Sequence, residues 1–221
     1  IKILLDSLVR SQLLPTQERN PLLASMTDDV AALVLADNIA QNALLGISRV
    51  TASQMLGVHR RQLTDLTKAR GLDRKLEALP TDKEIERRLE AGVGLTSPEL
   101  ATLTAHVKLS LKDDLLATEL PDNDFFAQQI PQYFPTAVRD RFETEIKAHP
   151  LRRQIVATML VNEVIDNGGI TYAYRLAEET GASSTDSIRA YAAVREVFAL
   201  DEVWSRIRSA GVSAEIEIGR A

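Results

Sequence analysis

The 221-residue sequence contains no cysteine, which excludes disulfides, thiolate zinc sites and thiol nucleophiles. It is also poor in the residue types that favour sheets and turns, with 5% aromatic residues, ten glycines and eight prolines. Leucine and alanine dominate the remainder, and both favour helix over strand. The composition therefore predicts an all-α fold.

Histidine is scarce as well. The three histidines, His59, His106 and His149, lie more than forty residues apart and form no His-x-x-x-His pair. Because a helical metal site needs closely spaced ligands, the sequence predicts no metal site. We interpret each histidine as a surface or half-buried structural residue.

Acidic side chains slightly outnumber basic ones, 31 against 26, for a formal net charge of −5. This balance argues against a dedicated nucleic-acid-binding protein and fits a cytoplasmic one. We find no signal peptide, and no apolar run that approaches the ~20 residues of a membrane span. The sequence therefore predicts a cytoplasmic protein without membrane contact. It opens with Ile-Lys-Ile inside an expected helix, which we interpret as a cut from a longer polypeptide.

The first helix is expected at residues 2–13. Its apolar stripe consists of Ile3, Leu4 and Leu8, with Leu5 beside them. A proline two residues after this segment breaks the helical pattern.

A second helix is expected to begin at Thr27. This residue is a good N-cap, because Asp28 and Asp29 follow in the first turn, where the helix dipole favours negative charge. The sequence of the helix, VAALVLADNIAQNALL, is apolar nearly all round at its start. We therefore predict that this helix is buried.

The segment of residues 50–75 allows two interpretations. TASQMLGVHRRQLTDL is similar to a helix-turn-helix with Gly57 at the turn, and residues 49–75 hold seven lysines and arginines against two aspartates. However, an apolar stripe continues through Gly57 in steps of four and three. A continuous helix explains it better, since a glycine inside a helix costs only about 1 kcal/mol. The stripe consists of Ala52, Leu56, His59, Leu63 and Leu66.

Caps and glycines mark the helix ends beyond residue 80. Thr81 and Glu84 have the spacing of a capping box, and Gly92 is a natural end for the helix they begin. Thr96 and Glu99 repeat the spacing at the start of the next helix. The buried face of that helix is expected to consist of Leu100, Leu103, Val107, Leu111 and Leu115.

Prolines at positions 121, 131 and 135 should divide the following stretch into short pieces. We interpret its aromatic residues as core residues rather than a ligand cage. These residues are Phe125, Phe126, Tyr133 and Phe134.

The last third of the chain should hold four more helices. The expected boundaries are His149-Pro150 to Gly168-Gly169, an end at Gly181, a cap at Ser183 or Ser184, and a cap at Asp201. The alternating AEIEI near the end is not taken as a strand. The fold is therefore predicted to be all-α, a multi-helix array of roughly eight to ten helices with no substantial sheet.

The sequence shows no active site. The run Gly92-Val-Gly-Leu-Thr-Ser lacks the third glycine of a dinucleotide loop and follows a helix, so we interpret it as a helix end joined to a helix start. Neighbouring acids on a helix point in different directions, so we interpret the pairs as caps and solvated faces. These pairs are Asp28-Asp29, Asp113-Asp114 and Glu178-Glu179. No nucleophile elbow is present.

Several ungapped blocks resemble the helical region that follows the catalytic domain in the large bacterial NAD-specific glutamate dehydrogenases. They are IKILLD, LLASMTDDVAALVLADNIAQ, GLDRKLEALP, GLTSPELATL, LPDN, YFP, HPLRRQIVATMLVNEVIDNGG and YRLAEETGAS, in the order of the family. The chain departs from the family at Ile130-Pro131, where a short helix is expected to be distorted. It departs again after Ala210, where its tail drifts and stops while the family continues with further helices.

The resemblance implies that residues 1–14 leave an upstream catalytic domain and that residues 15–221 form a helical C-terminal domain. It implies oxidative deamination of L-glutamate to 2-oxoglutarate and ammonia with NAD by the full-length enzyme. The residues for catalysis and NAD binding lie upstream in that family, so we assign no catalytic, cofactor-binding or metal residue here. The fragment is expected to be inactive.

The partners that the resemblance implies are the upstream catalytic domain of the same chain and further subunits of a homo-oligomer. The matched residues Asn162, Gly168 and Arg175 are interpreted as helix packing and termination. The alternative is a free-standing helical regulator that binds DNA through residues 50–75, although a nucleic-acid partner is disfavoured by the charge balance.

Overall fold

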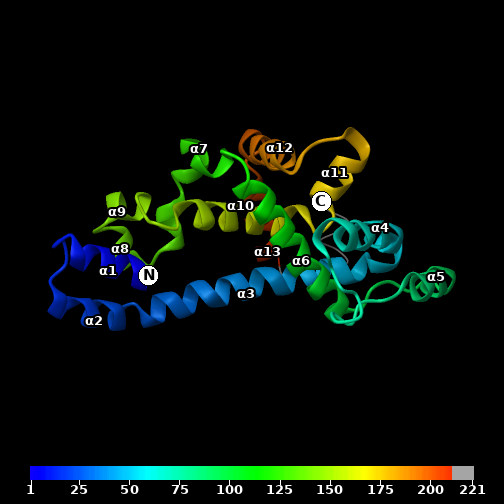
Figure 1. Cartoon of the computed structure of the whole chain (residues 1–221), viewed down its shortest axis with the longest axis horizontal. Coiled ribbons are helices and arrows are strands. Elements are labelled where there is room, and N and C mark those ends of the chain that lie inside the picture. The colour runs from blue at the N-terminus through cyan, green and yellow to red at the C-terminus, as the bar shows by residue number, and fades with distance from the viewer. Residues whose placement is uncertain (211–221) are drawn as a thin grey trace. The chain divides into compact units, whose positions relative to one another are not determined.

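The computed structural model describes residues 1–210, and helices make up 77% of the chain, which confirms the all-α prediction (Figure 1). Over these residues there are thirteen α-helices and two 3-10 helices, more than the eight to ten expected. The α-helices are α1 (Lys2–Arg10), α2 (Thr16–Ser25), α3 (Thr27–Val50), α4 (Ala52–Arg70), α5 (Asp82–Glu90), α6 (Ser97–Leu116), α7 (Asp124–Ala127), α8 (Thr136–Arg139), α9 (Glu143–Lys147), α10 (Arg152–Gly168), α11 (Tyr172–Thr180), α12 (Ser184–Val197) and α13 (Leu200–Ser209). The 3-10 helices are η1 (Leu120–Asp122) and η2 (Ile130–Tyr133).

The chain divides into two compact units. The first consists of Ile1–Ile39 and Leu116–Leu160, and the second consists of Ala40–Leu115 and the residues from Val161 onward. Helices α3 and α10 contribute residues to both units.

The first unit has its core around α1. Leu4, Leu5 and Leu8 are buried, whereas Ile3 is 43% exposed, so the predicted stripe was wrong at Ile3 and right at the two leucines it named. These leucines pack with apolar residues of α8, α9 and η2. The buried side chain of Phe134 belongs to the same core.

Prolines produce the short helices of the first unit. Between residues 121 and 135, the short elements η1, α7 and η2 confirm the division that the prolines predicted. The short helices α8 and α9 follow without having been predicted, and together these pieces account for the higher helix count. The 3-10 helix η2 lies at the departure from the family. The aromatic prediction was wrong in part, because Phe134 is buried but Phe125 and Tyr133 are 51% and 47% exposed.

In the second unit, α4 confirms the continuous helix. It runs through Gly57 without interruption, and the five residues of its predicted stripe are buried. Therefore no turn of a helix-turn-helix exists at Gly57. The helix ends at Gly71, which has a φ of 69°.

The joint between α5 and α6 is built as the capping residues predicted. The Thr81 hydroxyl accepts a hydrogen bond from the Glu84 N–H at 3.3 Å, and the Thr96 N–H donates to the Glu99 carboxylate at 2.8 Å. Gly94 lies against the backbone of Ala52, where an added Cβ would come within 2.2 Å of the Ala52 carbonyl carbon. The tight approach requires glycine at this position. The stripe of α6 is fully buried, as predicted.

The last helices largely follow the predicted boundaries. Ser183 caps α12 with a complete capping box that includes Asp186. The prediction for the last helix was wrong, because α13 begins at Leu200 after Ala199, and Asp201 lies in its first turn. Ala199 has a φ of 48°, so the backbone turns there without a capping side chain. The AEIEI segment lies outside the described residues.

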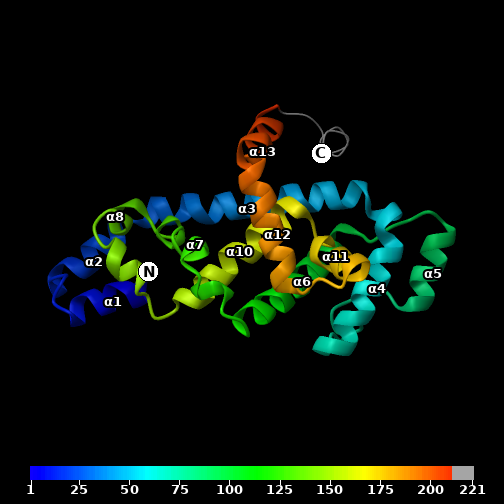
Figure 2. The ribbon, with the colours of Figure 1, turned by 90° about the horizontal axis from the view of Figure 1, so that it is seen from above.

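Helix α3 contradicts the prediction of a buried helix. Leu44 is its one fully buried residue, and every residue from position 31 to position 39 is exposed. Thr27 is its first residue, and the Thr27 hydroxyl donates to the Ala24 carbonyl at 2.8 Å, so it serves the end of α2 rather than the predicted N-cap. Figures 1 and 2 show α3 as one unbroken helix.

By length and composition, α3 could also cross a membrane, which the search for apolar runs missed. Its 24 residues include an 18-residue window of mean hydropathy 1.5, of which 6% is buried. A single such helix is weak evidence for a membrane span, because soluble core helices and signal sequences share these properties.

Candidate functional site

A polar hollow in the second unit is a candidate binding site. It has a volume of about 420 Å³ and is open to solvent. Residues of α10 and α13 line it: Glu163, Asn167, Asp201, Trp204, Ser205 and Ser209.

Arg195 ties the acidic groups of this hollow together. Its guanidinium donates to both carboxylate oxygens of Asp201 at 2.7 Å and lies 3.5 Å from Glu163 Oε1. The Tyr191 hydroxyl donates to the same Glu163 oxygen at 3.3 Å. The hydrogen bonds to Asp201 raise the pKa of Arg195, and burial raises the pKa of Tyr191. Both groups keep their protons near neutral pH, so they hold the carboxylates of Glu163 and Asp201 in the hollow by hydrogen bonds.

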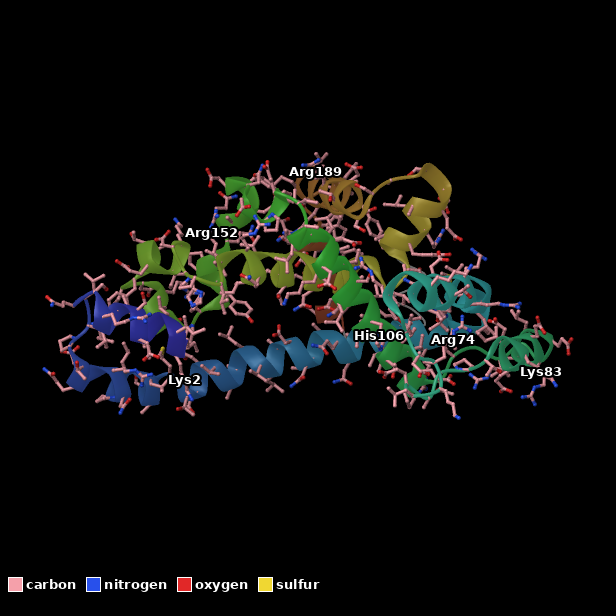
Figure 3. The ribbon with its side chains drawn as sticks, viewed as in Figure 1. Lys2, Arg74, Lys83, His106, Arg152 and Arg189 are labelled. Carbon is pink, nitrogen blue, oxygen red and sulfur yellow. The ribbon has the colours of Figure 1, made fainter. Side chains whose placement is uncertain are left out.

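Two of the three histidines are buried, which corrects the prediction of surface or half-buried residues. His59 is 3% exposed, and burial lowers its pKa to about 4. His149 is 5% exposed, and its Nδ1 accepts a hydrogen bond from the Leu151 N–H at 3.0 Å just before α10. His106, labelled in Figure 3, is half-buried with its Nε2 at 3.5 Å from Glu77 Oε1. Among residues 1–210, no three potential ligands gather into a metal site.

Two of the acidic pairs do more than face solvent. Asp114 receives hydrogen bonds from Arg70 and, at 2.7 Å, from the Ser184 hydroxyl. The Glu178 carboxylate accepts hydrogen bonds from Nε and Nη2 of Arg61, at 2.7 and 2.9 Å. Asp113, Glu178 and Glu179 are exposed, as expected of solvated faces, and Asp28 and Asp29 lie in the first turn of α3.

Ion pairs also occupy most of the basic residues that motivated the DNA-binding alternative. Arg60 pairs with Glu86 at 2.9 Å, and Arg74, labelled in Figure 3, pairs with Asp82 at 2.9 Å. With Arg61 and Arg70 also paired, four of the cations bind carboxylates of this chain. Phosphate binding would have to compete with these contacts.

The Gly92-to-Ser97 run is a helix joint, as the sequence indicated. Arg88 of α5 and Glu99 of α6 join the two helices across it through two hydrogen bonds of 2.7 and 3.0 Å. Burial raises the pKa of Glu99, but the hydrogen bonds from Arg88 and Thr96 outweigh that effect and lower it. The sequence predicted Glu99 as part of a capping box, and the pairing of Glu99 with Arg88 was not predicted.

Two further polar contacts connect distant segments of the second unit. Lys108 Nζ lies 2.7 Å from Asp166 Oδ1, and both side chains are mostly buried. The Gln62 side-chain amide donates to the Ile170 carbonyl at 3.0 Å. The sequence contains no local signal for either pair, because the partners lie 58 and 108 residues apart.

Asn162, Gly168 and Arg175, the residues matched to the family, lie in or at the ends of helices. A Cβ at Gly168 would approach the Tyr172 ring to 3.3 Å, so the small residue permits the turn between α10 and α11. Arg175 is exposed and lies 3.6 Å from Glu179 one turn later. Asn162 is half-buried on α10. None of the three lines the polar hollow.

Comparison with known proteins places these helices in a family context. The family model described as "Glutamate dehydrogenase, C-terminal" matches residues 92–218, and the model described as "Bacterial NAD-glutamate dehydrogenase, catalytic domain" matches residues 1–48. Three similar proteins are named NAD-specific glutamate dehydrogenase. The relative from Mycobacterium tuberculosis is 57% identical over 96% of this chain, that from Halomonas elongata 38% over 95%, and that from Pseudomonas aeruginosa 37% over 99%. The chain spans only 13–14% of the length of these relatives.

Proposed function

Because the chain belongs to the family of large bacterial NAD-specific glutamate dehydrogenases, we propose that it is a non-catalytic, mostly C-terminal helical part of such an enzyme. The full-length enzyme would oxidise L-glutamate to 2-oxoglutarate and ammonia, with NAD as the hydride acceptor. In this proposal the catalytic and NAD-binding residues precede Ile1. The chain itself contributes structure.

The observation that carries the proposal is the use of charged residues as cross-links between helices. Lys108 of α6 binds Asp166 of α10, and Arg61 of α4 binds Glu178 of α11. Removing one partner of the mostly buried Lys108–Asp166 pair would leave an uncompensated charge, so this pair fixes α6 against α10, whereas the exposed Arg61–Glu178 pair contributes less. An acid or base for catalysis would instead be left available to a substrate.

The role of this helical part is proposed to be packing on the catalytic domain, contact between subunits, or transmission of an allosteric state. Assembly into a homo-oligomer and a cytoplasmic location belong to the same proposal. The predicted boundary between residues 14 and 15 stays a prediction. The catalytic-domain match extends to residue 48, and the C-terminal match starts at residue 92.

Two measurements test the proposal. The 221-residue chain alone should show no heat of NAD binding by calorimetry and no NADH formation with glutamate. The full-length polypeptide should show both, and Lys108→Met should lower its thermal transition while leaving the KM for glutamate unchanged. Specific NAD binding at micromolar levels by the chain alone would overturn the non-catalytic assignment. A full-length polypeptide without glutamate-dependent NADH formation would overturn the proposed reaction.

A further inference from the structure

The uncovered part of α3 has a defined apolar face. Five of its exposed residues recur at helical spacing and share one side of the helix, which we call the α3 stripe: Ala32, Leu35, Ala36, Ile39 and Ala43. The two large side chains of the stripe, Leu35 and Ile39, are 58% and 61% exposed. Asp37 and Gln41 lie on the opposite side. Leu33 and Val34 on that opposite side are 40% and 54% exposed as well, so the middle of α3 is uncovered all round, and the α3 stripe is one continuous apolar face of it.

The composition of the α3 stripe suits close packing against another element. Three of its five residues are alanines, and Gly46 follows on the same side of the helix. Small side chains let helix axes approach to the short end of the usual range of about 8–10 Å. Leu35 and Ile39 would then insert into the partner as the main apolar contacts. A stripe of small residues alone would not identify a site, but here it frames two large exposed ones.

This chain holds α3 on both sides of the stripe. Val30 packs against the core of the first unit, and Leu44 is 3% exposed. Residues 31–39 between them are all exposed.

We propose that the α3 stripe is the docking surface for the part of the same polypeptide that precedes Ile1, namely the remainder of the catalytic domain. The catalytic-domain family model ends at residue 48, so α3 lies at the end of that match, whereas the C-terminal family model begins at residue 92. The relatives are several times longer than this chain. If α3 is the last helix of the catalytic domain, the rest of that domain precedes it in the sequence. Without those preceding residues, α3 lacks the neighbours that would cover it. The inference rests on the proposed function.

Two other occupants are less consistent with the residues of α3. A membrane would have to accommodate Asp37, Asn38, Gln41 and Asn42 near the middle of the helix, where polar groups are expensive. A second copy of the chain could pair stripe to stripe. That arrangement would cover the stripe without the residues that precede Ile1, so it is treated as an outcome of the test.

Photo-crosslinking in the full-length polypeptide identifies the occupant. A photoreactive amino acid replaces Ile39 in one variant and Gln41, on the opposite side of α3, in the control variant. Mass spectrometry of the digested products should find position 39 joined to residues preceding Ile1, several-fold more often than position 41. Crosslinks from position 39 to α3 of another copy, to lipid, to residues within this chain, or to nothing would each overturn the proposal.

A charge placed on the stripe provides an independent measurement. Ile39→Glu in the full-length polypeptide should lower the midpoint of thermal unfolding, whereas Gln41→Glu should leave it unchanged. Equal midpoints for the two variants would contradict the docking surface. Glutamate-dependent NADH formation by the unmodified polypeptide is measured in parallel. If that activity is absent while position 39 crosslinks to residues before Ile1, the proposed reaction fails and the docking surface stands. If the enzyme is active but the crosslink is absent, the docking surface fails and the proposed reaction stands.

Discussion

Helices α3 and α6 are the two longest of the described chain, with 24 and 20 residues, and both carry an apolar stripe. The stripe of α6 is buried over its whole length, with Leu103 and Leu115 at 0% exposure. The stripe of α3 is open, with Ile39 at 61% exposure. The same sequence pattern thus has two outcomes in one chain.

The difference teaches that periodicity defines a face but not its partner. In α6 the cover comes from helices of the same unit, and the helix is fixed at its start by Thr96 and Glu99. In α3 the cover must come from outside the described residues, since Leu35 and Ile39 are apolar side chains in contact with water. The energetic weight of the two stripes should therefore differ in the same chain.

The largest effect is expected for Leu103→Ala in α6. Truncation of a fully buried leucine removes apolar contacts and leaves a cavity, so the free energy of unfolding should fall by about 2–5 kcal/mol. Urea titration monitored by circular dichroism measures the loss. A cost below about 1 kcal/mol would show that α6 is not a core helix, and the comparison with α3 would collapse.

A second prediction extends the comparison to α4, whose buried stripe contains His59. The pKa of His59 is lowered to about 4 in the folded chain, so between pH 6.5 and pH 4 the unfolded chain binds a proton that the folded chain does not. The neutral His59 ring therefore destabilises nothing above pH 6.5, but the free energy of unfolding falls as the pH drops from 6.5 to 4. The loss is up to about 3 kcal/mol, at 1.36 kcal/mol per pKa unit.

Urea titrations of the parent and of His59→Gln between pH 7.5 and about 4 isolate this effect. Carboxylates titrate in both proteins, so only the difference between them reports on His59. The free energy of unfolding of the parent should fall more steeply with acid. Parallel curves would mean that the His59 ring reaches water and that the α4 stripe is open there.

A smaller effect is expected where α6 begins. Thr96→Ala removes the hydroxyl that the sequence predicts as the N-cap and should cost about 1 kcal/mol, the usual value for a lost N-cap. The same urea titration measures the loss. If Thr96→Ala proves as costly as Leu103→Ala, the position of the helix start matters as much as the buried face.

The smallest effect is expected for Ile39→Ala in the 221-residue chain. The side chain is exposed, so the free energy of unfolding should change by no more than about 0.5 kcal/mol, as for other surface positions. A loss comparable to that of Leu103→Ala would show that α3 is covered within this chain, and the proposed docking surface would lose its basis.

Much of the fold was predictable from the sequence because local chemistry determines helix ends. Thr81, Thr96 and Ser183 begin helices as their hydroxyls and following acids indicated. The continuous helix through Gly57 followed from the spacing of its apolar residues. These features depend on neighbours within one or two turns of the chain.

The errors concern interactions that the local sequence does not encode. Burial of His59 and His149 and the cover of Leu35 depend on which distant segments pack against them. Arg61 and Glu178 are 117 residues apart, so no motif announces their ion pair. The expectation of no catalytic or cofactor residue stays a prediction, and no pattern marked the polar hollow, because its residues come from two helices.

The glycines show how unevenly the chain would tolerate redesign. A methyl group at Gly94 would collide with the backbone of Ala52, whereas one at Gly46 meets nothing within 4 Å, and one at Gly57 meets only the tip of Arg61 at 4.0 Å. Alanine is favoured over glycine inside a helix by about 1 kcal/mol. Replacing Gly46 or Gly57 by alanine should therefore stabilise the chain. At Gly46, on the side of the α3 stripe, the added methyl group would also occupy space where the preceding domain is proposed to pack closely.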